Sequence, residues 1–111
     1  MTKRLKIPYN TLHMMTKQTI QSLSVPLFQK YRVKRAALFG SVARGEARDA
    51  SSDIDILVEM GKGRAFDFFS LQEDLRERFG RRVDLVEYVA LRPELKDSIL
   101  ADAVTMYESK P

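Results

Sequence analysis

Residues 53–59, Asp-Ile-Asp-Ile-Leu-Val-Glu (DIDILVE), decide how this sequence is expected to fold. Side chains of a strand alternate between its two faces, so the even-numbered apolar residues are predicted to face a core. Asp53 and Asp55 then share the opposite face, about 6.6 Å apart along the strand. Two neighbouring carboxylates repel each other unless solvent or a cation screens them. Their oxygen atoms suit a hard cation such as Mg²⁺, and the alternative is a polar strand start at the protein surface.

A second strand of the same design is predicted over residues 82–88, Arg-Val-Asp-Leu-Val-Glu-Tyr. Its apolar positions alternate with Arg82 and Asp84. If this strand lies beside the first with the same face up, Asp84 completes a cluster of three carboxylates. Such a cluster could hold two metal ions that act on a phosphate. The alternative is a carboxylate at a strand edge that pairs with Arg81 or Arg82.

A third motif, Leu-Phe-Gly-Ser-Val-Ala-Arg-Gly-Glu-Ala-Arg, covers residues 38–48 and follows a predicted strand. Gly40 permits a positive φ and a close approach of the backbone to a ligand. Ser41 offers a hydroxyl group, and free N–H groups at such a turn attract phosphates. Arg44 and Arg48 could add charge-assisted contacts. The motif lacks the glycine and lysine spacing of a P-loop.

The rest of the chain predicts an alternation of helices and strands in one domain, 1–111, with residues 1–10 as an N-terminal extension. Helices are expected over 11–23, 26–31, 66–79 and 93–103, and strands over 34–39, 53–59, 82–88 and 104–107. Leu95, Ile99 and Leu100 are expected to face the core, and so are the phenylalanines of the third helix. This order indicates an α+β or α/β fold in which helices pack on a small sheet.

Charge is divided unevenly along the 111 residues, although the net charge is only +4. Residues 1–45 carry nine bases and no acid, whereas residues 46–111 carry all 15 acids and the other ten bases. The basic half raises the hypothesis of nucleic-acid binding, although no reader helix or aromatic-rich sheet is recognisable. The chain has no cysteine, which excludes disulfides and thiolate metal sites. It has neither a signal-like apolar segment nor a run of ~18 apolar residues, so a cytoplasmic protein without a membrane span is expected.

Taken together, the three motifs resemble those of the DNA polymerase β-like nucleotidyltransferase superfamily, and most closely its smallest branch, the minimal nucleotidyltransferases (MNT). The resemblance runs from about residue 25 to residue 107. The matching segments are LFGS at 38–41, ARGEA at 43–47, SDIDILV at 52–58 and VDLV at 83–86. The segment 42–52 is one residue longer than the family pattern.

The resemblance implies a polymerase β-like fold, with a small mixed sheet packed by helices, and assigns roles to six residues. The residues that would hold the nucleotide triphosphate are Gly40, Ser41 and Arg44. The catalytic residues would be Asp53, Asp55 and Asp84. The same three residues would ligate the metal, which would be two Mg²⁺ ions. Asp84 would also help to deprotonate the acceptor hydroxyl.

The resemblance also implies a reaction and a partner. Proteins of this kind are often paired with a helical HEPN-type toxin, and the nucleotidyltransferase acts as the antitoxin. The expected reaction is the transfer of AMP from ATP to a hydroxyl group of that toxin, on a tyrosine, within a hetero-oligomer. The alternative is a catalytically silent antitoxin that neutralises its partner by contact alone.

Overall fold

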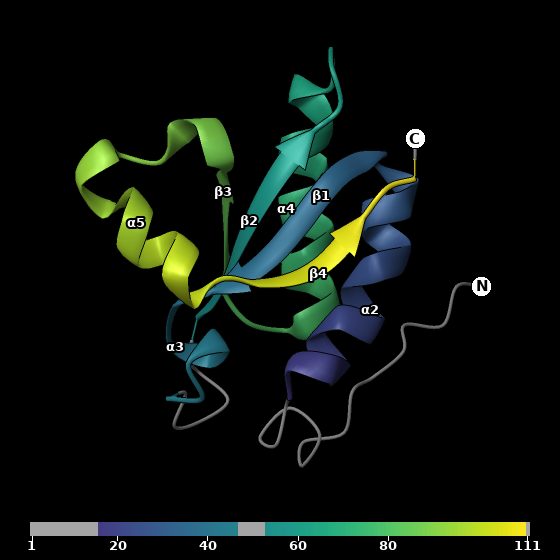
Figure 1. Ribbon diagram of the computed structural model, residues 1–111. Coiled ribbons are helices and arrows are strands. Elements are labelled where there is room, and N and C mark those ends of the chain that lie inside the picture. Colours follow the sequence, from purple (N-terminus) through teal and green to yellow (C-terminus); the bar gives the residue numbers. More distant parts are fainter. Residues whose placement is uncertain (1–15, 47–52, 111) are drawn as a thin grey trace.

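A four-stranded mixed sheet forms the centre of the computed structural model, which describes residues 16–46 and 53–110 (Figure 1). The strand order is β3-β2-β1-β4, where β1 is Val33–Phe39, β2 is Ile54–Met60, β3 is Val83–Glu87 and β4 is Val104–Glu108. Strand β1 is antiparallel to both β2 and β4, whereas β2 and β3 are parallel. The four strands predicted from the sequence are confirmed, each within two residues at either end.

Two helices, α2 (Lys17–Lys30) and α4 (Ala65–Phe79), cover one face of the sheet (Figure 1). Beneath them lie Ile54, Ile56 and Val58, all fully buried, as the alternation of β2 predicts. Helix α4 connects β2 to β3, and a crossover of this kind is what a parallel pair of strands requires. The α+β fold with a helix-packed mixed sheet is therefore confirmed.

Helix α2 is continuous, whereas two separate helices were predicted on either side of Val25. Pro26 lies inside the helix, where its missing N–H group removes one hydrogen bond of the ladder. The buried side chains of Ile20, Leu27 and Phe28 hold both halves of the helix on the sheet despite this loss. The predicted helix start at residue 11 and the extension 1–10 lie outside the described residues.

Helix α4 lies where it was predicted, but not every side chain that was predicted to be buried is buried. It ends at Gly80, which has the left-handed conformation of a C-cap. Leu71, Leu75 and Phe79 recur every four residues and face the core. Phe66 and Phe69 point away from that stripe and are 89% and 65% exposed, so their assignment to the core was wrong.

Helix α5 (Pro93–Asp102) also contradicts its predicted packing, because none of its side chains is buried. Leu95 and Leu100 are exposed, and Ile99 is only partly covered. The chain must pass from β3 at one edge of the sheet to β4 at the other, through η1 (Tyr88–Ala90) and α5. Helix α5 therefore contacts α3 (Gly40–Ala43) and β1 and stands apart from α2 and α4 (Figure 1). No helix in the described ranges is long and apolar enough to cross a membrane.

Candidate active site

Two carboxylates face each other where β2 and β3 begin. The parallel register sets Asp55 directly opposite Asp84, and the N–H group of Ile54 donates to the carbonyl oxygen of Arg82 at 3.1 Å. Asp53 lies immediately before β2, and its Oδ2 atom is 3.8 Å from Nε of Arg82. The same Nε lies 3.2 Å from Oδ1 of Asp84. The structure thus places the three aspartates predicted from the sequence at one end of the sheet.

The Asp55 carboxyl group has a pKa raised from 3.8 to about 6. Partial burial is the largest cause, because a charged carboxylate loses hydration there. The negative charges of Asp84 and Asp53 raise the pKa further, and the positive charge of Arg44 partly opposes them. A site that holds carboxylates together at this electrostatic cost favours a cation.

Gly40 brings the end of β1 into contact with this carboxylate. Phe39 pairs with Asp55 across the two strands, and Gly40 follows with φ of +76°. A Cβ atom at Gly40 would lie only 2.2 Å from Oδ2 of Asp55, well inside van der Waals contact. The close backbone approach that the sequence predicts at this glycine is therefore an approach to the Asp55 side chain.

Ser41 and Arg44 come from the short helix α3 and the residue that follows it. The carbonyl oxygen of Ser41 accepts a hydrogen bond from the N–H group of Glu46 at 2.8 Å, which closes the turn. Arg44 donates through Nε to Glu46 at 3.0 Å and through a terminal nitrogen to Asp102 at 3.0 Å. Arg48 lies outside the described residues.

Sequence reasoning missed two partners at this site. Asp102 at the end of α5 binds Arg44 from 58 positions away, and no local motif marks it. Arg82 was considered only as a partner of Asp84, whereas it contacts Asp53 as well. The alternating pattern of 82–88 puts Arg82 and Asp84 on one face. If this strand lies beside 53–59 with the same face up, Arg82 also comes close to Asp53, so the pattern could have indicated the second contact.

The residues present fit a divalent cation in their chemistry. Carboxylate oxygens are the ligands that Mg²⁺ prefers, and Asp55 and Asp84 already converge. No group of three acidic or histidine side chains forms a ready metal cluster within the ranges that the structure describes. The third carboxylate, Asp53, lies beside the guanidinium group of Arg82 instead.

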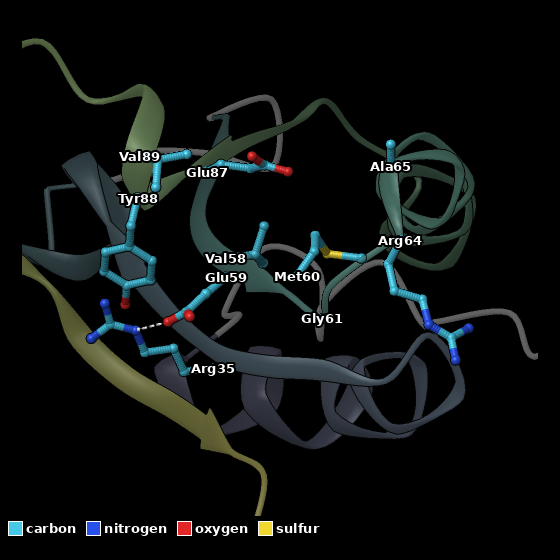
Figure 2. Close-up of a pocket in the computed structure, with 11 residues that line it drawn as sticks. Arg35, Val58, Glu59, Met60, Gly61, Arg64, Ala65, Glu87, Tyr88 and Val89 are labelled. Carbon is cyan, nitrogen blue, oxygen red and sulfur yellow. Dashed lines mark hydrogen bonds and ion pairs between the residues drawn. The ribbon is translucent and has the colours of Figure 1, made fainter.

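A separate pocket of about 460 Å³ lies near the other end of β2 (Figure 2). On one side of it Arg35 pairs with Glu59 at 2.9 Å and stacks over the ring of Tyr88 at 4.0 Å. On the other side are the first residues of α4, near Ala65 (Figure 2). Glu59 is four residues beyond Asp55, about 13 Å along the strand. The lining includes none of the predicted site residues, so this pocket is distinct from the aspartate site.

Comparison with known proteins finds a family and close relatives. The family model described as "Polymerase beta, Nucleotidyltransferase" matches residues 24–111. A Methanocaldococcus jannaschii protein, provisionally named protein adenylyltransferase MJ0435, is 47% identical over 72% of this chain and 86% of its own length. Protein adenylyltransferase MntA of Thermococcus cleftensis is 33% identical over 82% of this chain and 96% of its own length.

Solved structures agree with the sequence relatives. A structure provisionally described as a minimal nucleotidyltransferase superposes with a TM-score of 0.70 at 34% identity, covering 88% of this chain and 95% of that one. A toxin-antitoxin crystal structure with AMP-PNP superposes with a TM-score of 0.67 at 20% identity, covering 81% of this chain and 74% of that one. The second likeness shows the fold alone.

We predict that Gly40→Ala destabilises the protein more than Gly63→Ala. Both glycines have positive φ, of +76° and +77°, so each substitution costs roughly 1–2 kcal/mol of backbone strain. Nothing lies within 4 Å of a Cβ atom at Gly63, whereas at Gly40 it would meet Asp55. Gly40→Ala should therefore lose about 1–3 kcal/mol beyond the control, measured by denaturant unfolding. Equal losses for the two variants would contradict the close approach.

We predict that Asp55→Asn stabilises the metal-free protein, and more so at higher pH. The folded pKa of about 6 lies above the ordinary 3.8, so the stabilising effect of protonation is lost as pH rises through about 6. Asparagine is neutral at every pH and avoids that loss. Thermal unfolding in a chelator should show a gain of roughly 2–6 °C near pH 8 and a smaller one near pH 4.5. A gain that shrinks as pH rises would contradict the assigned direction.

Proposed function

The chain belongs to the polymerase β nucleotidyltransferase family, and from this premise we propose that it is an antitoxin of the MNT type that adenylylates a partner protein. The proposed reaction transfers AMP from ATP to a hydroxyl group, on a tyrosine, of a HEPN-type helical toxin. The observation that carries the proposal is the pair Asp55 and Asp84, set opposite each other and closed on one side by Gly40. The names of the relatives support the reaction class, and the fold shared with a toxin-antitoxin structure supports the partner.

Each residue of the site has a proposed role. Gly40 lets the backbone at the end of β1 approach the Asp55 carboxylate closely, and Ser41 offers a hydroxyl group for the triphosphate at the same turn. Arg44 lies close enough to lower the pKa of Asp55, and its guanidinium group can exchange its exposed acidic partners for phosphate oxygens. Asp53, Asp55 and Asp84 would hold two Mg²⁺ ions, which when bound neutralise charge on the triphosphate and favour ionisation of the acceptor hydroxyl.

The proposed chemistry is a single displacement at the α-phosphorus of ATP. The acceptor oxygen forms a bond to this phosphorus, and the bond from the phosphorus to the oxygen that bridges to the β-phosphate breaks. Pyrophosphate departs with that electron pair, and the Asp84 carboxylate accepts the hydroxyl proton. This residue is the second of β3 and is only partly covered, so an acceptor can reach it from solvent.

A second candidate function is neutralisation of the partner by contact alone. The exposed apolar side chains of Val89, Leu95 and Leu100 favour it, because η1 and α5 bury little of their apolar surface within this chain. Chemistry and contact are separated by the double variant Asp53→Ala/Asp55→Ala in a growth assay with the partner toxin. Loss of neutralisation, with binding retained, supports transfer, whereas retained neutralisation supports contact.

We predict that Asp55→Asn abolishes transfer of label from α-³²P-ATP to the partner in the presence of Mg²⁺. The loss should be on the order of 100-fold or more, because the variant removes one of two converging carboxylates. Asp67→Asn is the matched control, since Asp67 pairs with Arg64 in the first turn of α4 and should leave labelling unchanged. Labelling by the folded Asp55 variant at the wild-type rate would refute the assignment.

A further inference from the structure

Arg82 lies between two of the three carboxylates of the candidate site. Its Nε atom is 3.2 Å from Oδ1 of Asp84 and 3.8 Å from Oδ2 of Asp53. The negative charge of Asp55 acts on it as well, and all three aspartates raise the pKa of the guanidinium group, Asp84 most strongly. A single side chain thus supplies positive charge to two of the carboxylates that the proposed reaction requires as cation ligands.

The backbone of Arg82 is hydrogen-bonded to β2, while its side chain is largely exposed. Its carbonyl oxygen accepts a hydrogen bond from the N–H group of Ile54, which anchors the residue to β2. Its side chain is 67% exposed, so the guanidinium group can turn into solvent without disturbing the core. Arg82 immediately precedes β3 and is two positions before Asp84, so the alternation of an extended chain sets both on the aspartate face.

This contact differs from an ordinary surface ion pair in what it neutralises. Asp55 and Asp84 are held together by the register of the sheet, and the fold cannot separate them without breaking β2 from β3. A positive charge at this place lowers the cost of that repulsion. A divalent cation bound to Asp53 and Asp84 would compete with Arg82 for these two carboxylates.

We propose that Arg82 is a built-in counter-cation, which neutralises the aspartate site in the metal-free protein and is displaced when a divalent cation binds. The inference rests on the proposed function, because it takes the three aspartates as cation ligands. Competition with Arg82 weakens binding of the free cation. Arg82 is a positioning residue under this proposal, since it contacts the ligands and not the reacting phosphate.

The test measures Mn²⁺ affinity of the full chain without nucleotide, by titration followed with electron paramagnetic resonance. Arg82→Gln should bind Mn²⁺ roughly three- to tenfold more tightly than wild type, the effect of removing one competing partner at a partly exposed site. Arg82→Lys keeps the charge and loses the planar fork, so its affinity should lie between the two. Arg92→Gln, which removes an exposed arginine at the start of α5, is the matched control and should match wild type.

A second measurement tests the metal-free state directly. In a chelator, Arg82→Gln should unfold at a lower temperature than Arg92→Gln, and added Mn²⁺ should raise its unfolding temperature more than that of wild type. Unchanged Mn²⁺ affinity with a higher KM for ATP would overturn the proposal and make Arg82 a nucleotide ligand. Saturable Mn²⁺ binding that is equal in all variants would overturn the role of Arg82 alone. Absence of Mn²⁺ binding in every variant would overturn the cation site and the role of Arg82 with it.

Discussion

The forced approach of like charges at the start of β2 and β3 is the constraint around which the rest of the site is arranged. Parallel pairing sets Asp55 opposite Asp84, and the alternate residues of both strands are locked into the core under α2 and α4. A slip of one residue in either strand would exchange a carboxylate for a buried isoleucine or leucine. Hydrophobic burial therefore stabilises an electrostatically unfavourable pair, which is a common arrangement where function, and not stability, determines the residues.

The neighbours of the Asp55–Asp84 pair accommodate its two negative charges. Gly40 has no side chain because Asp55 Oδ2 occupies the space where a Cβ atom would be. Two arginines lie at the site: Arg82 immediately precedes β3, and Arg44 immediately follows α3. Asp102 ties Arg44 to the end of α5, so the helix that buries none of its side chains is still linked to the aspartate site. A partner that covers α5 would thus sit close to the groups that the proposed reaction uses.

The parts of the structure that could be predicted from the sequence are those where a short-range sequence pattern permits only one local structure. Strand alternation placed the carboxylates on one face and the isoleucines on the other, and Gly80 marked the end of α4. The errors arose where tertiary structure decides. Pro26 was expected to divide a helix that packing keeps whole, and the leucines of α5 were expected to be buried although the crossing from β3 to β4 leaves them outside. The contact of Arg44 with Asp102 depends on that crossing and has no local signal.

The uneven distribution of charge along the chain acquires a different meaning in the folded protein. Strand β1, from the basic first part of the chain, lies between β2 and β4, which both come from the acidic second part. Among the described residues, four ion pairs cross between the two parts: Lys30 with Asp74, Arg35 with Glu59, and Arg44 with both Glu46 and Asp102. Exposed pairs of this kind contribute little to stability, about 0–1 kcal/mol each, but each one compensates a positive charge where it lies. A basic surface that binds nucleic acid needs uncompensated charge gathered on one face, and this topology works against it. The charge that matters for the proposed reaction is local, where three carboxylates face two arginines at the end of the sheet.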